Sequence, residues 1–188
     1  MEQIIQYLNS FYPLPESLKQ EIRQLLKHRQ LPRKSFLLKA GQVSQLLCFI
    51  EKGLLRTFYI KDDKEINTWF LMEGDVAISM HSFFGQAPST QSIQALEETS
   101  IYYITNAELQ NLYRHQEFNI IGRRITETYS QQWTQQLQSI KSQTATERYD
   151  WLMEHRPQLV LRLPAKYIAS YLGITDVTLS KIRSKKRL

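Results

Sequence analysis

Cysteine is almost absent from this sequence of 188 residues, in which Cys48 is the only one. A disulfide within the chain is therefore impossible, and so is an iron–sulfur cluster or a zinc site held by several cysteines of one chain. The sequence also lacks an apolar run of the roughly 20 residues that a membrane-spanning helix needs, and its N-terminal residues do not resemble a signal peptide. We therefore expect a cytoplasmic protein without membrane contact, and a buried structural thiol at Cys48.

Basic residues are unevenly distributed along the chain. Residues 1–140 contain 14 Lys and Arg against 14 Asp and Glu, whereas residues 141–188 contain 10 against 4 and account for the whole net charge of +6. No Lys or Arg occurs in residues 65–113, while the last eight residues, KIRSKKRL, contain five. A basic end on an otherwise neutral chain favours binding to a polyanion.

The spacing of apolar residues changes along the chain. Residues 3–29 have helical spacing, interrupted at YPLP, and a second helix is expected from Ser17 to His28. Residues 36–104 contain short apolar and aromatic runs separated by turn-forming residues, which is typical of an antiparallel sandwich or barrel. After a capping-box pair, Thr144 and Glu147, we expect a helix that ends at Pro157 and then a short β-like run, LVLRL.

Between these two parts, seven apolar residues are spaced three or four positions apart: Phe118, Ile121, Ile125, Tyr129, Trp133, Leu137 and Ile140. Their mean repeat of about 3.7 matches a nearly straight α-helix with one apolar face. Such a long helix can pack on its own β domain or against the same helix of a second copy. We favour a homodimer, with the contact on Phe118, Ile121, Ile125 and Tyr129.

The segment IASYLGITDVTLSKIR, residues 168–183, has the pattern of two helices joined by a turn. Gly173 permits the left-handed conformation that ends the first helix, and Thr175 can cap the second. Ala169 allows the two helices to cross closely, while Leu179 and Ile182 pack inward. The outward side of the second helix is then polar and basic, which suits the major groove of double-stranded DNA.

This arrangement resembles the family of cyclic-AMP-receptor/fumarate-nitrate-regulator (Crp/Fnr) transcription factors. The segment above and the order LLCFIEKGLLRTFYI…FLMEGD are its most specific parts. The resemblance implies an α+β fold with an antiparallel β-roll of the cyclic-nucleotide-binding type (a double-stranded β-helix). The implied domains are a β-roll sensor domain with N-terminal helices (1–115), a dimerisation helix (116–143) and a small winged helix-turn-helix (144–188). The chain carries little sequence for the wing hairpin.

Residue by residue, the resemblance implies that Thr175 and Thr178 hold phosphates and that Asp176, Val177 and Lys181 face base edges. The remaining candidate DNA contacts are Ser180, Arg183, Lys185 and Lys186. The implied partners are double-stranded DNA, a second copy of the chain and RNA polymerase. The sequence does not fix the operator, the target genes or the direction of regulation.

The effector cassette departs from the family pattern. Ile78 and Ser79 stand where cyclic-nucleotide-binding members have a glycine and a ribose-binding glutamate, and Ser89 and Thr90 stand where they have the phosphate-binding arginine and its neighbour. A buried phosphate monoanion needs a bidentate cation or a ring of backbone donors. We therefore expect no cofactor and no cyclic AMP or cyclic GMP, and leave open whether the roll holds another small molecule or is a ligand-free scaffold.

Two other classes of protein fit parts of the sequence. A cupin-like metal enzyme could share the β-roll, although the histidines are scattered, at 28, 81, 115 and 155. A ligand-binding module could use its basic tail on a membrane or a protein partner. We find no motif of nucleophilic catalysis, no P-loop and no dinucleotide-binding fingerprint, and so expect no enzyme activity.

Overall fold

A computed structural model describes residues 1–185 of the chain. Its helices are α1 (Glu2–Phe11), α2 (Glu16–Leu25), α3 (Met80–Gly85), α4 (Asn106–Leu112), α5 (Gln116–Ser142), α6 (Ala145–His155), α7 (Pro157–Arg162), α8 (Ala165–Leu172) and α9 (Asp176–Ser184). Its strands are β1 (Lys27–Leu31), β2 (Phe36–Leu38), β3 (Leu46–Lys52), β4 (Leu54–Lys61), β5 (Lys64–Met72), β6 (Val76–Ala77), β7 (Ser92–Ala95) and β8 (Thr99–Thr105). The predicted α+β fold with an antiparallel β-roll is confirmed.

The β-roll consists of two four-stranded antiparallel sheets. Sheet A has the order β1-β8-β3-β6, and sheet B has the order β2-β7-β4-β5. Because side chains alternate along a strand, Cys48 and Ile50 of β3 lie between the two sheets, whereas Leu47 and Phe49 point outward to the helices. Cys48 is fully buried, as predicted, and this burial raises the pKa of its thiol to about 12.

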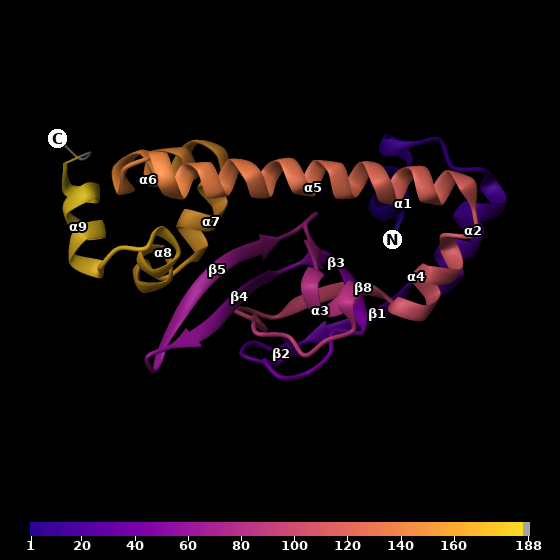
Figure 1. The fold of residues 1–188 in the computed structure, drawn as a ribbon, viewed down its shortest axis with the longest axis horizontal. Coiled ribbons are helices and arrows are strands. Elements are labelled where there is room, and N and C mark those ends of the chain that lie inside the picture. Colours follow the sequence, from indigo (N-terminus) through magenta and orange to yellow (C-terminus); the bar gives the residue numbers. More distant parts are fainter. Residues whose placement is uncertain (186–188) are drawn as a thin grey trace.

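Helices lie at both ends of the roll, and α5 runs along its side from one group to the other (Figure 1). Three apolar cores result. The first fills the roll, the second lies between sheet A and α1, α2, α4 and α5, and the third lies within α6–α9. The third core includes Leu54 and Phe70 of sheet B, so that the C-terminal helices pack directly on the roll.

Two elements differ from the sequence-based predictions. The second helix ends at Leu25, because residues from Lys27 onward pair with β8 as strand β1, with Lys27 opposite Tyr103. The run LVLRL is not β-like: residues 159–162 belong to α7, which Pro157 begins, and Leu163 is the residue that ends the helix. Its buried residues Leu159 and Leu163 are four positions apart, which is the spacing of one helix face and not of a strand.

Candidate nucleic-acid interface

The two predicted C-terminal helices, α8 and α9, are both present and meet at Gly173. Gly173 has φ 69°, the left-handed conformation that glycine adopts without strain, and the N–H of Ile174 donates to the carbonyl of Ala169 at 3.0 Å. Ala169 is buried between the helices. The turn therefore has the geometry that the sequence indicated.

The side chains of α9 divide into a buried and an exposed set. Leu179 and Ile182 are buried in the third core. The hydroxyl of Thr175 accepts a hydrogen bond from the N–H of Thr178 at 3.2 Å and caps the helix. The exposed candidates are Asp176, Val177, Thr178, Ser180, Lys181 and Lys185. Lys186 lies outside the described residues.

Arg183 lies differently from the other candidates. Its Nε donates to the hydroxyl of Tyr149 on α6 at 3.1 Å, and the guanidinium lies over the ring of that tyrosine. Arg183 therefore fixes α9 to α6 within the chain, while Lys181 and Lys185 keep their ammonium groups in solvent. Helix α9 lies at one end of the molecule, beyond the end of α5, so its exposed side is accessible from outside (Figure 1).

Sequence reasoning missed Arg148, which supports this pair of helices. Its guanidinium donates to the carbonyl of Leu172 at 2.8 Å and to that of Gln143 at 2.6 Å. It thereby satisfies the last carbonyls of α8 and α5, which have no partner within their own helices. Cations are favoured at helix C-termini, but no local pattern indicates that Arg148, near the start of α6, binds the ends of α8 and α5.

The four residues assigned to the effector cassette do not form one pocket. Ser79 and Ser89 come together, with their hydroxyl oxygens 3.1 Å apart, and Ser89 also bonds with the backbone of Gln91. Ile78 points to the opposite side and packs against the helical core next to sheet A. Thr90 is exposed. The hydroxyl groups of Ser79 and Ser89 thus bond to each other.

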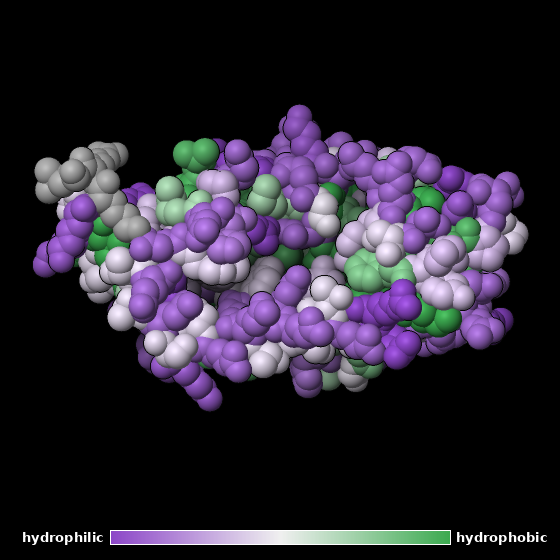
Figure 2. Space-filling view, turned by 90° about the horizontal axis from the view of Figure 1, so that it is seen from above, coloured by the Kyte–Doolittle hydropathy of each residue, from purple (hydrophilic) through white to green (hydrophobic). Residues whose placement is uncertain are grey.

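The four residues assigned to the dimer contact lie against the chain itself. Phe118 and Ile121 are buried in the core formed with α1, α2 and α4, and Ile125 and Tyr129 are partly buried. The C-terminal half of α5 leaves large apolar side chains exposed instead, namely Trp133, Leu137 and Ile140. Trp133 stacks on Trp69 of β5, with ring centroids 5.6 Å apart. Figure 2, seen from the α5 side, shows apolar side chains in separate patches on a mainly hydrophilic face.

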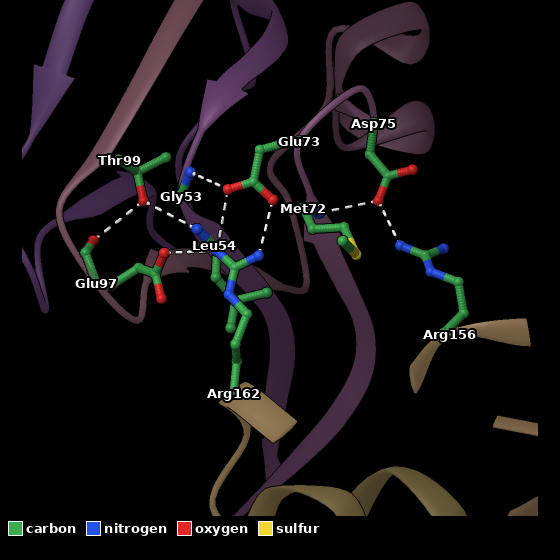
Figure 3. Close-up of polar contacts among 9 residues, drawn as sticks. All are labelled: Gly53, Leu54, Met72, Glu73, Asp75, Glu97, Thr99, Arg156 and Arg162. Carbon is green, nitrogen blue, oxygen red and sulfur yellow. Dashed lines mark hydrogen bonds and ion pairs between the residues drawn. The ribbon is translucent and has the colours of Figure 1, made fainter. Parts of the chain in front are cut away.

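An ion-pair cluster, which we call the domain junction, joins the C-terminal helices to the roll (Figure 3). Arg162 of α7 bonds both carboxylate oxygens of Glu73, at 2.7 and 3.1 Å, and also Glu97 at 2.5 Å. Arg156 bonds Asp75 at 2.6 Å. Glu73 and Asp75 belong to the turn that leads from β5 into β6 and the effector cassette, so this turn is held directly by the C-terminal helices.

Backbone geometry reinforces the domain junction. The N–H of Gly53 donates to Glu73 at 2.8 Å, and a Cβ at Gly53 would lie 2.4 Å from the hydroxyl oxygen of Thr99. Glycine is therefore required at this position, which also has φ 117°. Partial burial by itself raises the pKa of Glu73, but Arg162 and the Gly53 N–H outweigh it and lower the pKa to about 2.

A second contact between the two parts is centred on Arg56 in β4. This side chain is buried, bonds Glu65 at 2.6 Å and lies between the rings of Phe58 and Tyr167, the latter from α8. Nearby, the Ser170 hydroxyl of α8 accepts a hydrogen bond from the backbone N–H of Asn67 at 3.0 Å. Helix α8 is thus held on the β4–β5 hairpin by an aromatic–cation stack and by hydrogen bonds.

Comparisons with known proteins agree with this architecture. Residues 28–116 match the family model of the cyclic nucleotide-binding domain. A CooA double mutant from Carboxydothermus hydrogenoformans matches with a TM-score of 0.70 and 19% identity, covering 88% of this chain and 78% of its own. FixK2 from Bradyrhizobium japonicum matches with 0.70 and 18%, covering 86% and 84%. The catabolite activator protein of Thermus thermophilus matches with 0.58 and 15%, covering 93% and 84%.

The chain therefore shares the fold of these three proteins, a β-roll of the cyclic-nucleotide-binding type followed by a long helix and C-terminal helices. The resemblance in fold to Crp/Fnr regulators that the sequence predicted is confirmed. A search of curated proteins by sequence found no match.

Among residues 1–185, no three His, Cys, Asp or Glu side chains lie where they could together hold a metal ion. In the same part of the chain, no helix is long and apolar enough to cross a membrane.

Proposed function

We propose that this chain is a homodimeric, sequence-specific DNA-binding transcription regulator that reads the major groove with α9. The observation that carries the proposal is the division of α9 into a buried side and an exposed polar side that ends in basic residues. Leu179 and Ile182 fix the helix on the core, while Asp176, Val177 and Lys181 stay in solvent. A major groove accommodates one α-helix, with side chains near its N-terminus at the base edges.

The test is selection of bound fragments from a random duplex library, followed by titration of the selected duplex at several salt concentrations. We expect a palindromic site whose half-sites are about 34 Å apart, because two copies present α9 to successive major grooves. No enrichment, together with no duplex binding at low ionic strength, would contradict the proposal. Binding to anionic vesicles in place of duplex would favour the ligand-binding module with a basic tail.

The homodimer rests on the C-terminal half of α5. Trp133, Leu137 and Ile140 are spaced three or four positions apart on one side of the helix and are about half exposed or more in the single chain. Pairing with the same helix of a second copy buries this side. Their partial exposure supports a contact displaced towards the C-terminal end of α5, relative to the residues first assigned.

We further propose that cyclic AMP does not control this regulator. Ser79 and Ser89 bond to each other where the ligand's ribose and phosphate would need a carboxylate and a guanidinium, and no Lys or Arg occurs in residues 65–113. Calorimetric titration with cyclic AMP and cyclic GMP tests this directly, and we expect no heat of binding. Binding of either nucleotide with a matching change in DNA affinity would contradict it.

Regulation then operates through the pose of α9 relative to the roll. The domain junction and the Arg56 contact hold α6–α9 on the β4–β5 hairpin and on the turn before β6. A change in the roll or in α5 that weakens these contacts shifts the population of poses and with it the DNA affinity. RNA polymerase is the proposed partner at the promoter, and in vitro transcription from the selected site tests that step.

A further inference from the structure

A small cavity lies outside the roll, between the outer side of sheet A and the surrounding helices. Its walls include Ile4 and Leu8 of α1, Ile22 of α2, Phe49 of β3, and Ile78 just after β6. Another wall is the side of α5 between Phe118 and Tyr129, and residues of α3, α4 and β8 also line the cavity. The cavity therefore separates the effector cassette from the helix that leads to the C-terminal domain.

The chemistry of the walls selects the kind of occupant. The cavity volume is about 70 Å³, and among the described residues no charged side chain lines it. Hydroxyl groups are supplied only by Tyr113, Thr126 and Tyr129, and that of Thr126 already donates to the carbonyl of Gly122 at 2.8 Å. A trapped water needs two to four polar partners, and apolar cavities bind apolar molecules instead. The chemistry of these walls suits an uncharged apolar molecule that widens the cavity, and it does not suit an anion such as a nucleotide.

Met80 and Phe84 of α3 line the cavity and are 37% and 47% exposed, which leaves two large apolar side chains partly in water. We infer from this exposure that the mouth of the cavity lies at α3. Both come from the short helix inside the effector cassette. A bound molecule brings these two side chains into apolar contact, and the unbranched methionine can adjust its shape to the molecule. Binding therefore buries additional apolar area of these two side chains, which favours the bound state.

Movement of the opposite wall reaches the DNA-binding elements. Trp133, which stacks on Trp69 of β5, lies on α5 four positions after Tyr129. The backbone of α5 packs closely on the ring of Tyr113, because a Cβ at Gly122 would lie 2.5 Å from that ring. A molecule that widens the cavity therefore displaces α5 as a rigid element and changes its position against β5.

We propose that this cavity is the effector site and that its ligand is a small, uncharged, apolar molecule. The inference rests on the proposed function, because it names the effector class of the regulator. Occupation separates α5 from the cassette and shifts the pose of α9. The cyclic-nucleotide position of the roll, with its bonded pair Ser79 and Ser89, takes no part.

The experiment uses fluorobenzene as the probe and the full chain as the protein. Fluorine NMR line broadening measures binding to the wild type, to Ile78→Phe, which fills the cavity, and to Ile60→Phe, the matched control at an exposed site. We expect Ile78→Phe to weaken binding at least about tenfold and Ile60→Phe to leave it unchanged. Phe84→Ala at the exposed mouth is the second variant, expected to weaken binding even if Ile78→Phe does not fold.

Two further readouts test the effector role. In a Trp151→Phe background, fluorobenzene should change the emission of the Trp69–Trp133 pair, and it should change the affinity for the selected duplex at least about fivefold. No binding, or equal binding to the wild type and to folded Ile78→Phe, overturns the site. Binding that changes neither readout overturns the effector role. If the chain binds no duplex, the proposed function fails by itself, whereas the NMR and emission measurements still decide the site.

Discussion

Arg162 binds Glu73 with both terminal nitrogens of its guanidinium, at 2.7 and 3.1 Å, across the boundary between α7 and the β-roll. Two parallel hydrogen bonds fix the orientation of the planar group as well as its distance. Because Glu73 opens the turn before β6, and Arg162 closes α7, this pair links the effector cassette to the helices that carry α9. The geometry of the cassette and the pose of α9 are therefore connected by one bidentate contact.

The first prediction concerns this pair. Arg162→Glu places three carboxylates together and should loosen the domain junction, which lowers the midpoint of urea unfolding. The further change Glu73→Arg restores an opposite-charge pair and should recover part of the loss. Because both side chains are partly exposed, we expect a coupling energy of about 1 kcal/mol.

The measurement is a double-mutant cycle from unfolding of the wild type, the two single variants and the double variant. DNA affinity is measured on the same four proteins. A coupling energy of zero would show that the pair contributes nothing to the contact between α7 and the roll. If the double variant recovers stability but not DNA affinity, the pair does not control the pose of α9.

The second prediction is a pH dependence caused by Glu73. Its pKa is about 2 in the folded chain against an ordinary value of 4.5, so the ionised form is favoured by folding. Its contribution to stability is present above about pH 4.5 and is lost as the pH falls towards 2. Between pH 5 and pH 3, the free energy of unfolding of Glu73→Gln should therefore fall by about 1 kcal/mol less than that of the wild type. This difference is smaller than the full pKa difference implies, because the group is partly exposed.

Urea unfolding at pH 5 and at pH 3 measures this difference. Glu98→Gln is the matched control, since Glu98 is an exposed carboxylate in the loop that also carries Glu97. The control should show the full wild-type loss. An equal loss in Glu73→Gln would mean that the bond to Arg162 does not shift the titration of this carboxylate.

Local features of the fold could be predicted from the sequence because their causes lie within a few residues. The left-handed Gly173, the Thr175 cap and the capping box of Thr144 and Glu147 depend on neighbouring backbone groups alone. The apolar repeat from Phe118 to Ile140 likewise predicted a long helix, which the structure has over Gln116–Ser142. In each case the local residues determine the local conformation, and contacts with distant parts of the chain are not needed.

The contacts that build the site could not be predicted in this way. Arg162 and Glu73 are 89 positions apart, and Arg156 and Asp75 are 81 apart, so no local pattern pairs them. Strand β1 could not be predicted for the same reason, because it pairs with residues of β8 that lie 68 to 76 positions later. Phe118 and Ile121, predicted for the dimer contact, are instead buried within the chain, because α1 and α2 pack on the same side of α5.

The third prediction concerns the second copy of the chain. Leu137→Arg places a charge in the centre of the exposed apolar side of α5 and should weaken self-association at least about tenfold, because a buried unpaired charge is costly. Gln135→Arg, two positions away and therefore on another side of the helix, is the control and should leave association unchanged. Sedimentation velocity over a concentration series measures both. Dimers of equal strength in the two variants would place the contact elsewhere.

The fourth prediction separates reading of bases from attraction to phosphates on α9. Lys181 is exposed in the middle of the helix, whereas Lys185 is exposed at its C-terminal end. Lys181→Ala should cost about 1–3 kcal/mol on the selected duplex and much less on a scrambled one, because the lost contact is to a base edge. Lys185→Ala should weaken both duplexes alike and lower the salt slope by about 1, because one phosphate contact and its released counterion are lost.

Fluorescence anisotropy titrations of both duplexes at four salt concentrations distinguish the two effects. Lys61→Ala, at an exposed lysine at the end of β4, removes one positive charge outside α9 and controls for net charge. If Lys181→Ala loses the same affinity for the selected and the scrambled duplex, Lys181 contacts phosphates and not a base edge. Since α9 is fixed to α6 through Arg183 and Tyr149, such a result would mean that the fixed pose presents Lys181 to the backbone, and base reading would then rest on Asp176 and Val177.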